Sequence, residues 1–398
     1  MSGAHRHAAV GQDDVVRRGR RALTACVVGL VLVTLAGLVL LRPGGEASVA
    51  FPDAGERVKA TVTVVTSMPC ADADPEAPDA PREVCVDLTL RLDEGPDTGA
   101  LITQTGGDNA TGRLGVGDSV VVAADRDAPS IDERYQITDT QRGTSLTVLA
   151  VLFALAVVAL GRWRGLTALL GLAISAVILV AWLVPALLAG RPPLPTATVG
   201  AAAVMLTVLL LAHGPSVRTA TAIVGTAASL LLTLALATVF VKVSSLTGLT
   251  SEEATFVQAV FGGLDLRGLL LAGIVIGALG ILDDVTVTQV STVYELRASD
   301  PTMATGTLYR AGLRVGRDHV ASLVNTLLLA YAGASLPLLV IFTTSSEGLV
   351  GTLTNGVVAE EVVRTLVGSI GLIAAVPLTT ALAAFTCPPH ERAAGAGH

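Results

Sequence analysis

The chain has 398 residues, of which 52% are hydrophobic and only 15% are charged, and its formal net charge is −7 at pH 7. About a quarter of the residues in a typical soluble domain are charged. The composition therefore argues against a soluble globular protein. The acidic residues concentrated in 42–142 argue against binding of this segment to nucleic acid, because phosphates would be repelled.

Long uncharged runs account for the shortage of charge. A bilayer core about 30 Å thick requires about 20 apolar residues in each spanning helix. We expect a polytopic α-helical membrane protein in contact with the lipid bilayer, with about eight transmembrane helices. Their expected positions are residues 22–41, 145–160, 166–189, 198–212, 220–241, 269–287, 320–343 and 362–385. No small-x-small cleavage site follows the first run, so we expect it to remain as an anchor.

The arginines predict the orientation of these helices. Arg17, Arg18, Arg20 and Arg21 directly precede the first run, and positive residues favour the cytoplasmic side. Both termini are then expected to be cytoplasmic. The predicted organisation is a basic N-terminus (1–21), a first helix (22–41), an extracytoplasmic domain (42–142), a seven-helix transmembrane domain (145–385) and a cytoplasmic tail (386–398).

The expected extracytoplasmic domain has a different pattern. It holds 19 Asp or Glu against 9 Lys or Arg, so it is strongly acidic. Apolar residues alternate with polar ones from Val84 to Leu92, as in a half-buried strand. Similar runs occur at 59–67, 101–105, 119–124 and 134–138. We expect a small β-rich domain, a barrel or a sandwich, with an OB-like barrel as one candidate.

Two of the four cysteines, Cys70 and Cys85, flank a proline-rich stretch of this domain. In an oxidising compartment such a pair most simply forms a disulfide. The spacing also permits two metal thiolates, but no histidine lies nearby to complete a site. We therefore expect a disulfide and no metal site.

Two adjacent carboxylates, Asp283 and Asp284, interrupt the sixth apolar run. At about 100° per residue, one face of this helix carries glycines in its first half and polar residues in its second half. We call this face the polar-glycine stripe; it comprises Gly273, Gly277, Gly280, Asp284, Thr288, Ser291 and Glu295. We expect the glycines to allow close helix packing.

The carboxylates have two interpretations. An ionised Asp at a helix centre costs about 2.5–3.5 kcal/mol on insertion scales, so it should face a cavity or find a partner. In one interpretation Asp284, with Asp283 and Asn325, binds a cation or relays a proton. In the other, the acids pair with Arg314 or Arg317 and fix helix packing. His213 and His319 lie on the same expected side.

Two long stretches resemble a known family. "GALGILDDVTVTQVSTVYELR" and "GRDHVASLVNTLLLAYAGASLPLL", preceded by "LLLAHGPSVRTATAIVGT", resemble the YibE/F-like family of bacterial membrane proteins, from about Thr147 to Phe385. The pattern formed by Tyr135, Ile137, Asp139 and Arg142 also fits that family. The resemblance implies a bacterial cytoplasmic membrane location and a transport-like role, without a known substrate.

We expect a gradient-driven permease of an ion or small solute that uses the polar-glycine stripe. The alternative is an envelope assembly or scaffold protein, in which the outer domain binds a protein partner or the chain forms a homo-oligomer. An enzyme is disfavoured because both acids lie on one helix and neither a Gly-x-Ser-x-Gly nor a His-Glu-x-x-His motif occurs. We expect no cofactor.

Overall fold

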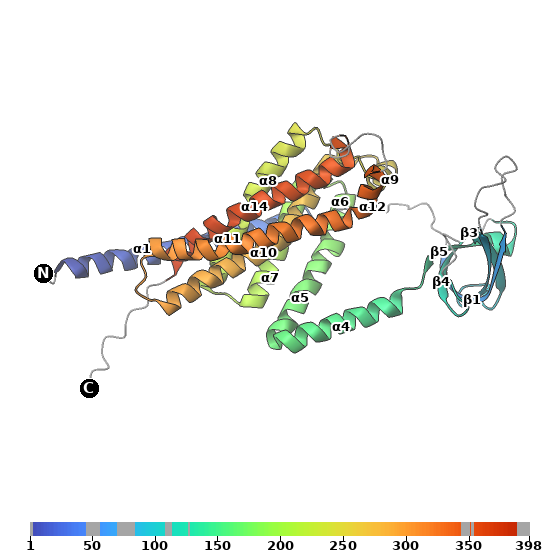
Figure 1. The fold of residues 1–398 in the computed structure, drawn as a ribbon, viewed down its shortest axis with the longest axis horizontal. Helices are drawn as coiled ribbons and strands as arrows, with labels where there is room; N and C mark the ends of the chain where they lie inside the picture. Colours follow the sequence, from blue (N-terminus) through green and yellow to red (C-terminus); the bar gives the residue numbers. More distant parts are fainter. Residues whose placement is uncertain are drawn as a thin grey trace. The chain divides into compact units, whose positions relative to one another are not determined.

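Helices make up most of the protein, and a small antiparallel sheet accounts for much of the rest (Figure 1). The computed structural model describes residues 3–44, 56–69, 84–107, 114–125, 128–343, 351 and 354–387. The chain forms two compact units. One comprises residues 48–159, and the other comprises residues 1–47 together with 160–398.

Five strands form a curled antiparallel sheet with the order β3-β2-β1-β4-β5. They are β1 (Glu56–Pro69), β2 (Val84–Leu92), β3 (Leu101–Gly107), β4 (Ser119–Ala124) and β5 (Tyr135–Thr140). The alternation predicted for the second strand is confirmed, because Val86, Leu88, Leu90 and Leu92 are at most 3% exposed. These side chains form the core of the sheet with residues of β1 and β4.

The short helix α3 (Ile131–Arg134) joins the two edge strands of the sheet. Asp132 of α3 accepts a hydrogen bond from the Thr103 amide of β3 at 2.7 Å, and its own carbonyl accepts one from the Gln104 side chain at 2.6 Å. Because β5 follows α3 directly, these bonds hold the two ends of the sheet together. They also satisfy donors of an edge strand that would otherwise be open for pairing.

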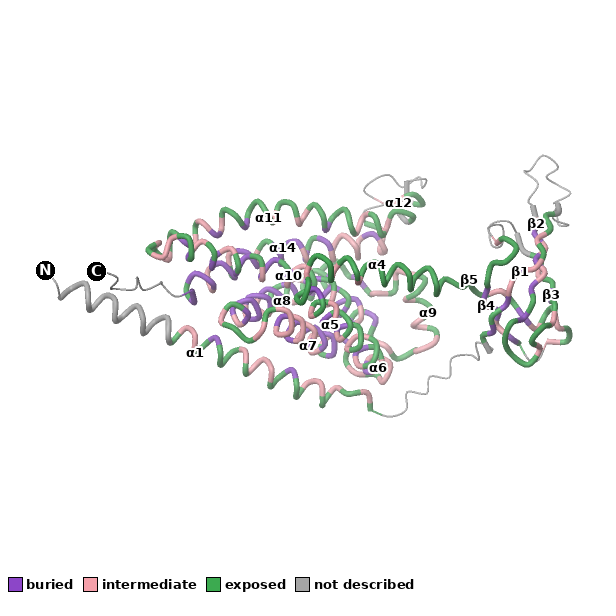
Figure 2. The backbone as a smooth tube through the Cα atoms, turned by 90° about the horizontal axis from the view of Figure 1, so that it is seen from below, coloured by how far each residue is buried: buried purple, intermediate pink, exposed green. Residues whose placement is uncertain are grey.

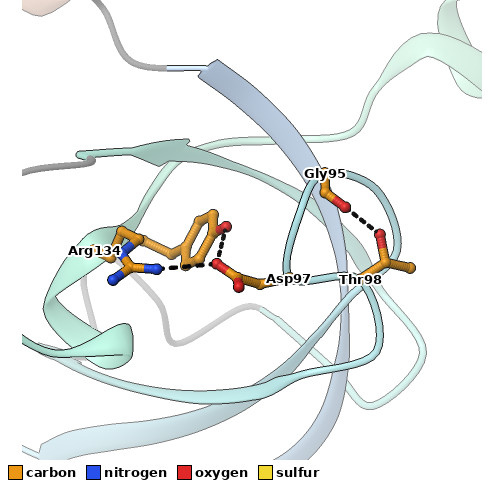
Figure 3. A network of polar contacts seen from close by, with 5 residues as sticks. Gly95, Asp97, Thr98 and Arg134 are labelled. Atoms are coloured by element: carbon orange, nitrogen blue, oxygen red, sulfur yellow. Dashed lines mark hydrogen bonds and ion pairs between the residues drawn. The ribbon is translucent and has the colours of Figure 1, made fainter.

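A polar contact inside this unit fixes the start of β5 (Figure 3). The fully buried Tyr135 donates its hydroxyl to Asp97 at 2.8 Å, and Arg134 forms an ion pair with the same carboxylate at 3.2 Å. At the other end of β5, Asp139 pairs with Arg142 at 2.5 Å. The Thr140 amide and then Arg142 hold the pKa of the Asp139 carboxyl below its usual value. Three members of the Tyr-Ile-Asp-Arg pattern therefore stabilise the last strand.

The helical unit begins with α1 and contains most of the long helices. They are α1 (Gly3–Leu40), α5 (Trp163–Val177), the π-helix η1 (Ile178–Leu183), α6 (Val184–Leu188), α7 (Pro193–His213), α8 (Val217–Val243), α9 (Glu252–Val260), α10 (Leu266–Ser299), α11 (Thr305–Ala334), α12 (Leu336–Thr343) and α14 (Gly356–Thr386). The helix α4 (Gly143–Gly161) leads into this unit and has no buried residue.

Within the described residues, seven helical segments are long and apolar enough to cross a membrane. They are Arg18–Leu40, Gly143–Gly161, Trp163–Leu188, Pro193–His213, Val217–Val243, Leu266–Ser299 and Gly356–Thr386. All seven coincide with runs expected from the sequence.

Residues 320–343, which we expected to form one transmembrane helix, do not form a single helix in the structure. They comprise the second half of α11, which begins at Thr305 and carries Arg314 and Arg317, followed by a break at Ser335 and the short helix α12. Pro337 has no amide hydrogen to donate to the preceding turn, which disfavours a continuous helix. The arginines make the first half of α11 too polar for an uninterrupted span.

Three helices, α8, α10 and α14, form the centre of the helical unit. Figure 2 shows that buried residues gather in these helices and in α7, whereas α11 is largely exposed. Small residues allow the close contacts: a Cβ added at Gly225 of α8 would lie 2.6 Å from Thr379 Oγ1 of α14. Gly371 of α14 meets Thr233 of α8 in the same way.

Buried polar side chains connect the same helices. Thr226 of α8 and Thr286 of α10 share a hydrogen bond of 2.6 Å. Gln289 of α10 donates to the Gly312 carbonyl of α11 at 2.8 Å and to Thr380 of α14 at 2.7 Å. Polar groups without access to water require such partners, so these bonds specify which face of α10 is turned inward.

We predict that Gly225→Ala lowers the stability of the helical unit by about 1–3 kcal/mol, because the added methyl group overpacks a close helix contact. Thermal unfolding of the purified protein in detergent measures this effect. Gly280→Ala is the matched control: open space surrounds this position, and alanine favours a helix over glycine. An equal loss of stability in both variants would contradict the packing described here.

We predict that Asp132→Ala loosens the closure of the sheet, because the Thr103 amide loses its acceptor at a cost of about 1 kcal/mol. Hydrogen exchange at the β3 amides should become faster in the full-length protein. Glu133→Ala removes the neighbouring exposed carboxylate and should leave this exchange unchanged. Unaltered exchange in Asp132→Ala would show that the sheet closes without this bond.

Candidate functional site

The polar-glycine stripe forms the exposed face of α10. All seven of its residues are exposed: Gly273, Gly277, Gly280, Asp284, Thr288, Ser291 and Glu295. The opposite face is apolar and buried; Ile274, Leu282 and Val285 are at most 2% exposed. The phase predicted from the sequence is therefore confirmed.

The two carboxylates lie near the middle of α10. The helix has 34 residues and runs from Leu266 to Ser299, so Asp284 lies about 27 Å along its axis at 1.5 Å per residue. The sequence analysis takes the apolar run to end near residue 287, so it predicts a shorter helix. The helix continues past that point through polar residues that are bonded within it, such as Thr288 and Thr292.

The carboxylate of Asp283 is only partly satisfied. One of its oxygens is buried and has no hydrogen-bond partner in the part of the chain that the structure describes. Asp284 lies beside it, and the two acids interact electrostatically. Asp284 also interacts with His319 of α11. An acidic pair at mid-helix with an unpaired buried oxygen provides a place where a proton or small cation would be stabilised.

The ion pairs considered as an alternative do not form. Arg314, Arg317 and Asn325 of α11 are exposed, and no ion pair or hydrogen bond links them to Asp283 or Asp284 among the described residues. Arg314 and Arg317 lie on the exposed side of α11. The helix is held to α10 by its glycines instead, since Gly312 and Gly316 contact Gln289.

The glycines of the stripe do not act as predicted. No atom of a neighbouring element in the described chain lies within 4 Å of the position that a Cβ would take at Gly273 or Gly280. Gly277 has one such neighbour, the Tyr331 hydroxyl at 3.2 Å. Glycines that pack helices together lie on other helices, such as Gly37 of α1, Gly225 of α8 and Gly371 of α14. A GxxxG spacing permits close packing but does not establish which partner is present.

A cavity of about 540 Å³ opens beside the second half of the stripe. Ser291 of α10 lines it, together with residues of α5, α7 and α8. Its basic lining residues are Arg164, His213 and Arg218. Sequence reasoning notes His213 but does not predict the cavity, because Arg164 and Arg218 lie in separate segments whose proximity depends on the packing of α5 on α7.

The four cysteines differ in their bonding state. Cys85 is disulfide-bonded, and Cys70, its predicted partner, lies outside the described residues. Cys26 and Cys387 are free thiols. In the part of the chain that the structure describes, no three His, Cys, Asp or Glu side chains are grouped to hold a metal ion.

The arrangement as a whole combines an exposed line of polar groups on one helix with a cavity at one end of that line. Such a combination can bind and pass small polar species, or present a surface to another helix.

The comparisons with known proteins agree with the sequence resemblance. The family model described as "YibE/F-like protein" matches residues 149–389. No curated protein and no solved structure matches the chain. The matched region contains α10, the cavity and α14, and it covers more than half of the chain. The chain therefore belongs to the YibE/F-like protein family.

Proposed function

We propose that the protein is a permease that moves an ion or small solute across a bacterial cytoplasmic membrane, driven by a gradient. The observation that supports this proposal most directly is the exposed polar-glycine stripe, which leads from the middle of α10 to a cavity of about 540 Å³.

The membrane setting is supported by the exposed apolar surface. Large side chains such as Leu149, Phe153 and Leu160 are between 52% and 92% exposed. The helix α4 has no buried residue. Soluble proteins rarely expose so much continuous apolar surface. The arginine bias supports an N-terminus in the cytoplasm and residues 42–142 outside, where the disulfide of Cys85 fits an oxidising compartment.

The stripe then requires water or a ligand. An Asp, a Thr and a Ser facing hydrocarbon would be costly, and ionisable residues within spans characteristically face a cavity or an ion pathway. The unpaired oxygen of Asp283 and the adjacent Asp284 suit a site that is occupied in turn by a proton or cation. At Gly273 and Gly280, no neighbouring atom of the described chain lies within 4 Å of the position of an added Cβ. We infer a route along the stripe with the two acids at its narrow middle.

The scaffold alternative is favoured by a different observation. Residues 48–159 form a compact unit around their own core, which could present a surface to a protein partner without help from the helices. In this alternative the acids of α10 are dispensable and the outer unit is essential.

We predict that purified protein in proteoliposomes supports proton or cation flux under an imposed membrane potential. Asp284→Asn should reduce that flux at least tenfold, because it removes the charge at the centre of the route. Internal dyes for pH, Na⁺ and K⁺ measure the flux. Asp318→Asn, which neutralises an exposed carboxylate on α11, is the matched control and should retain it.

Equal flux in the wild-type protein and in Asp284→Asn would contradict the role of α10. Absence of flux in a folded wild-type protein, combined with a cellular function that survives Asp284→Asn but not deletion of residues 56–140, would favour the scaffold instead.

A further inference from the structure

The cavity beside Ser291 has a strongly one-sided charge. We propose that it binds a phosphate-type oxyanion, held by Arg164, Arg218 and His213. This inference deepens the proposed function by naming a substrate class, and it rests on that function for its physiological meaning. The binding itself is measurable without transport.

The first observation is the set of charged groups. Arg164 comes from the start of α5, His213 from the end of α7 and Arg218 from the first turn of α8, so three helices direct basic side chains to one cavity. None of the described residues that line the cavity is acidic. Arginine is the residue best suited to phosphate, because its planar group donates two parallel hydrogen bonds.

The second observation is that neighbouring side chains orient Arg218 but do not use all of its hydrogen-bond donors. Its guanidinium carbon lies 4.7 Å from the centre of the Tyr294 ring, a cation–π contact that orients it. It also approaches Glu295 at 3.6 Å, a loose pair in which the carboxylate is 72% exposed. Such exposed pairs contribute little, so the guanidinium retains donors for a ligand.

The third observation concerns the backbone at the same place. The 27-residue helix α8 begins beside the cavity, and its N-cap, Ser216, lines it. The Ser216 hydroxyl accepts a hydrogen bond from the Thr219 amide at 3.1 Å. The positive end of the helix dipole therefore adds to the two arginines, and together these groups favour an anion over a cation.

The volume and the apolar walls of the cavity indicate what else the ligand carries. Its volume of about 540 Å³ lies within the usual range for small-molecule sites, about 300–1,000 Å³. Apolar residues such as Leu209 and Val290 complete its walls. An oxyanion that carries an organic group would use both kinds of surface. A free phosphate compound and the headgroup of an anionic phospholipid share this chemistry.

The test is equilibrium binding to full-length protein in a neutral detergent. Inorganic phosphate is titrated in one arm and monitored by calorimetry. In the other arm the protein is reconstituted with phosphatidylglycerol or with phosphatidylcholine alone, and its thermal stability is compared. We expect Arg164→Gln and Arg218→Gln each to weaken binding about tenfold, as expected for one lost charge-assisted hydrogen bond. Arg310→Gln, an exposed arginine on α11 away from the cavity, should have no effect.

Phosphate binding that weakens in both cavity variants but not in Arg310→Gln supports a free phosphate compound as the ligand. Stabilisation by phosphatidylglycerol alone, lost in the same variants, supports the lipid headgroup. Absence of both effects, or equal effects in all three arginine variants, would overturn the inference. If neither phosphate nor lipid binds while Asp284-dependent flux persists, the anion site is rejected and the permease proposal is retained. If an anion binds but no Asp284-dependent flux occurs, the permease proposal alone is rejected.

Discussion

The orientation of α10 depends on the buried bonds of Gln289. This side chain joins α10 to Gly312 of α11 and to Thr380 of α14, while the neighbouring Thr286 is bonded to Thr226 of α8. In a membrane the hydrophobic effect provides little force between helices, so small residues and interhelical hydrogen bonds determine packing. Rotating α10 would bury its acids and leave these polar groups unpaired. The same bonds that hold the bundle together therefore keep the polar-glycine stripe exposed.

This constraint gives α10 two different faces with two different roles. The inner face carries Thr286 and Gln289, whose hydrogen bonds are made within the bundle. The outer face carries Asp284, Thr288 and Ser291, whose side chains have no comparable partners on neighbouring helices in the described chain. At one end of this face, the cavity gathers basic residues of α5, α7 and α8. Acids at the middle of the helix and bases beside its end would suit a route in which a proton or cation and an anion are handled at separate places.

The sequence predicts those parts of the structure that depend on local pattern. Alternation predicted the strand Val84–Leu92, and helical phase predicted the exposed face of α10. It does not predict which surface a helix partner will cover. The GxxxG glycines were assigned to packing, whereas Gly225 and Gly371, which lie among threonines, make the close contacts. The alternative in which the acids pair with Arg314 or Arg317 does not hold among the described residues, where both arginines are exposed. The cavity was not predicted because its residues meet only through tertiary packing.

The measurement that tests the central claim most directly is the water accessibility of α10 in membranes. Single cysteines at Thr288, Ser291 and the buried Thr286 would be compared in a background in which the exposed Cys26 is replaced by serine. A charged, membrane-impermeant thiol reagent, applied to each side of the membrane in turn, should from one side modify the cysteines at 288 and 291 rapidly and the one at 286 slowly. Equal protection at all three positions, with modification only by an apolar reagent, would show that lipid or protein covers the stripe and would contradict a water-filled route.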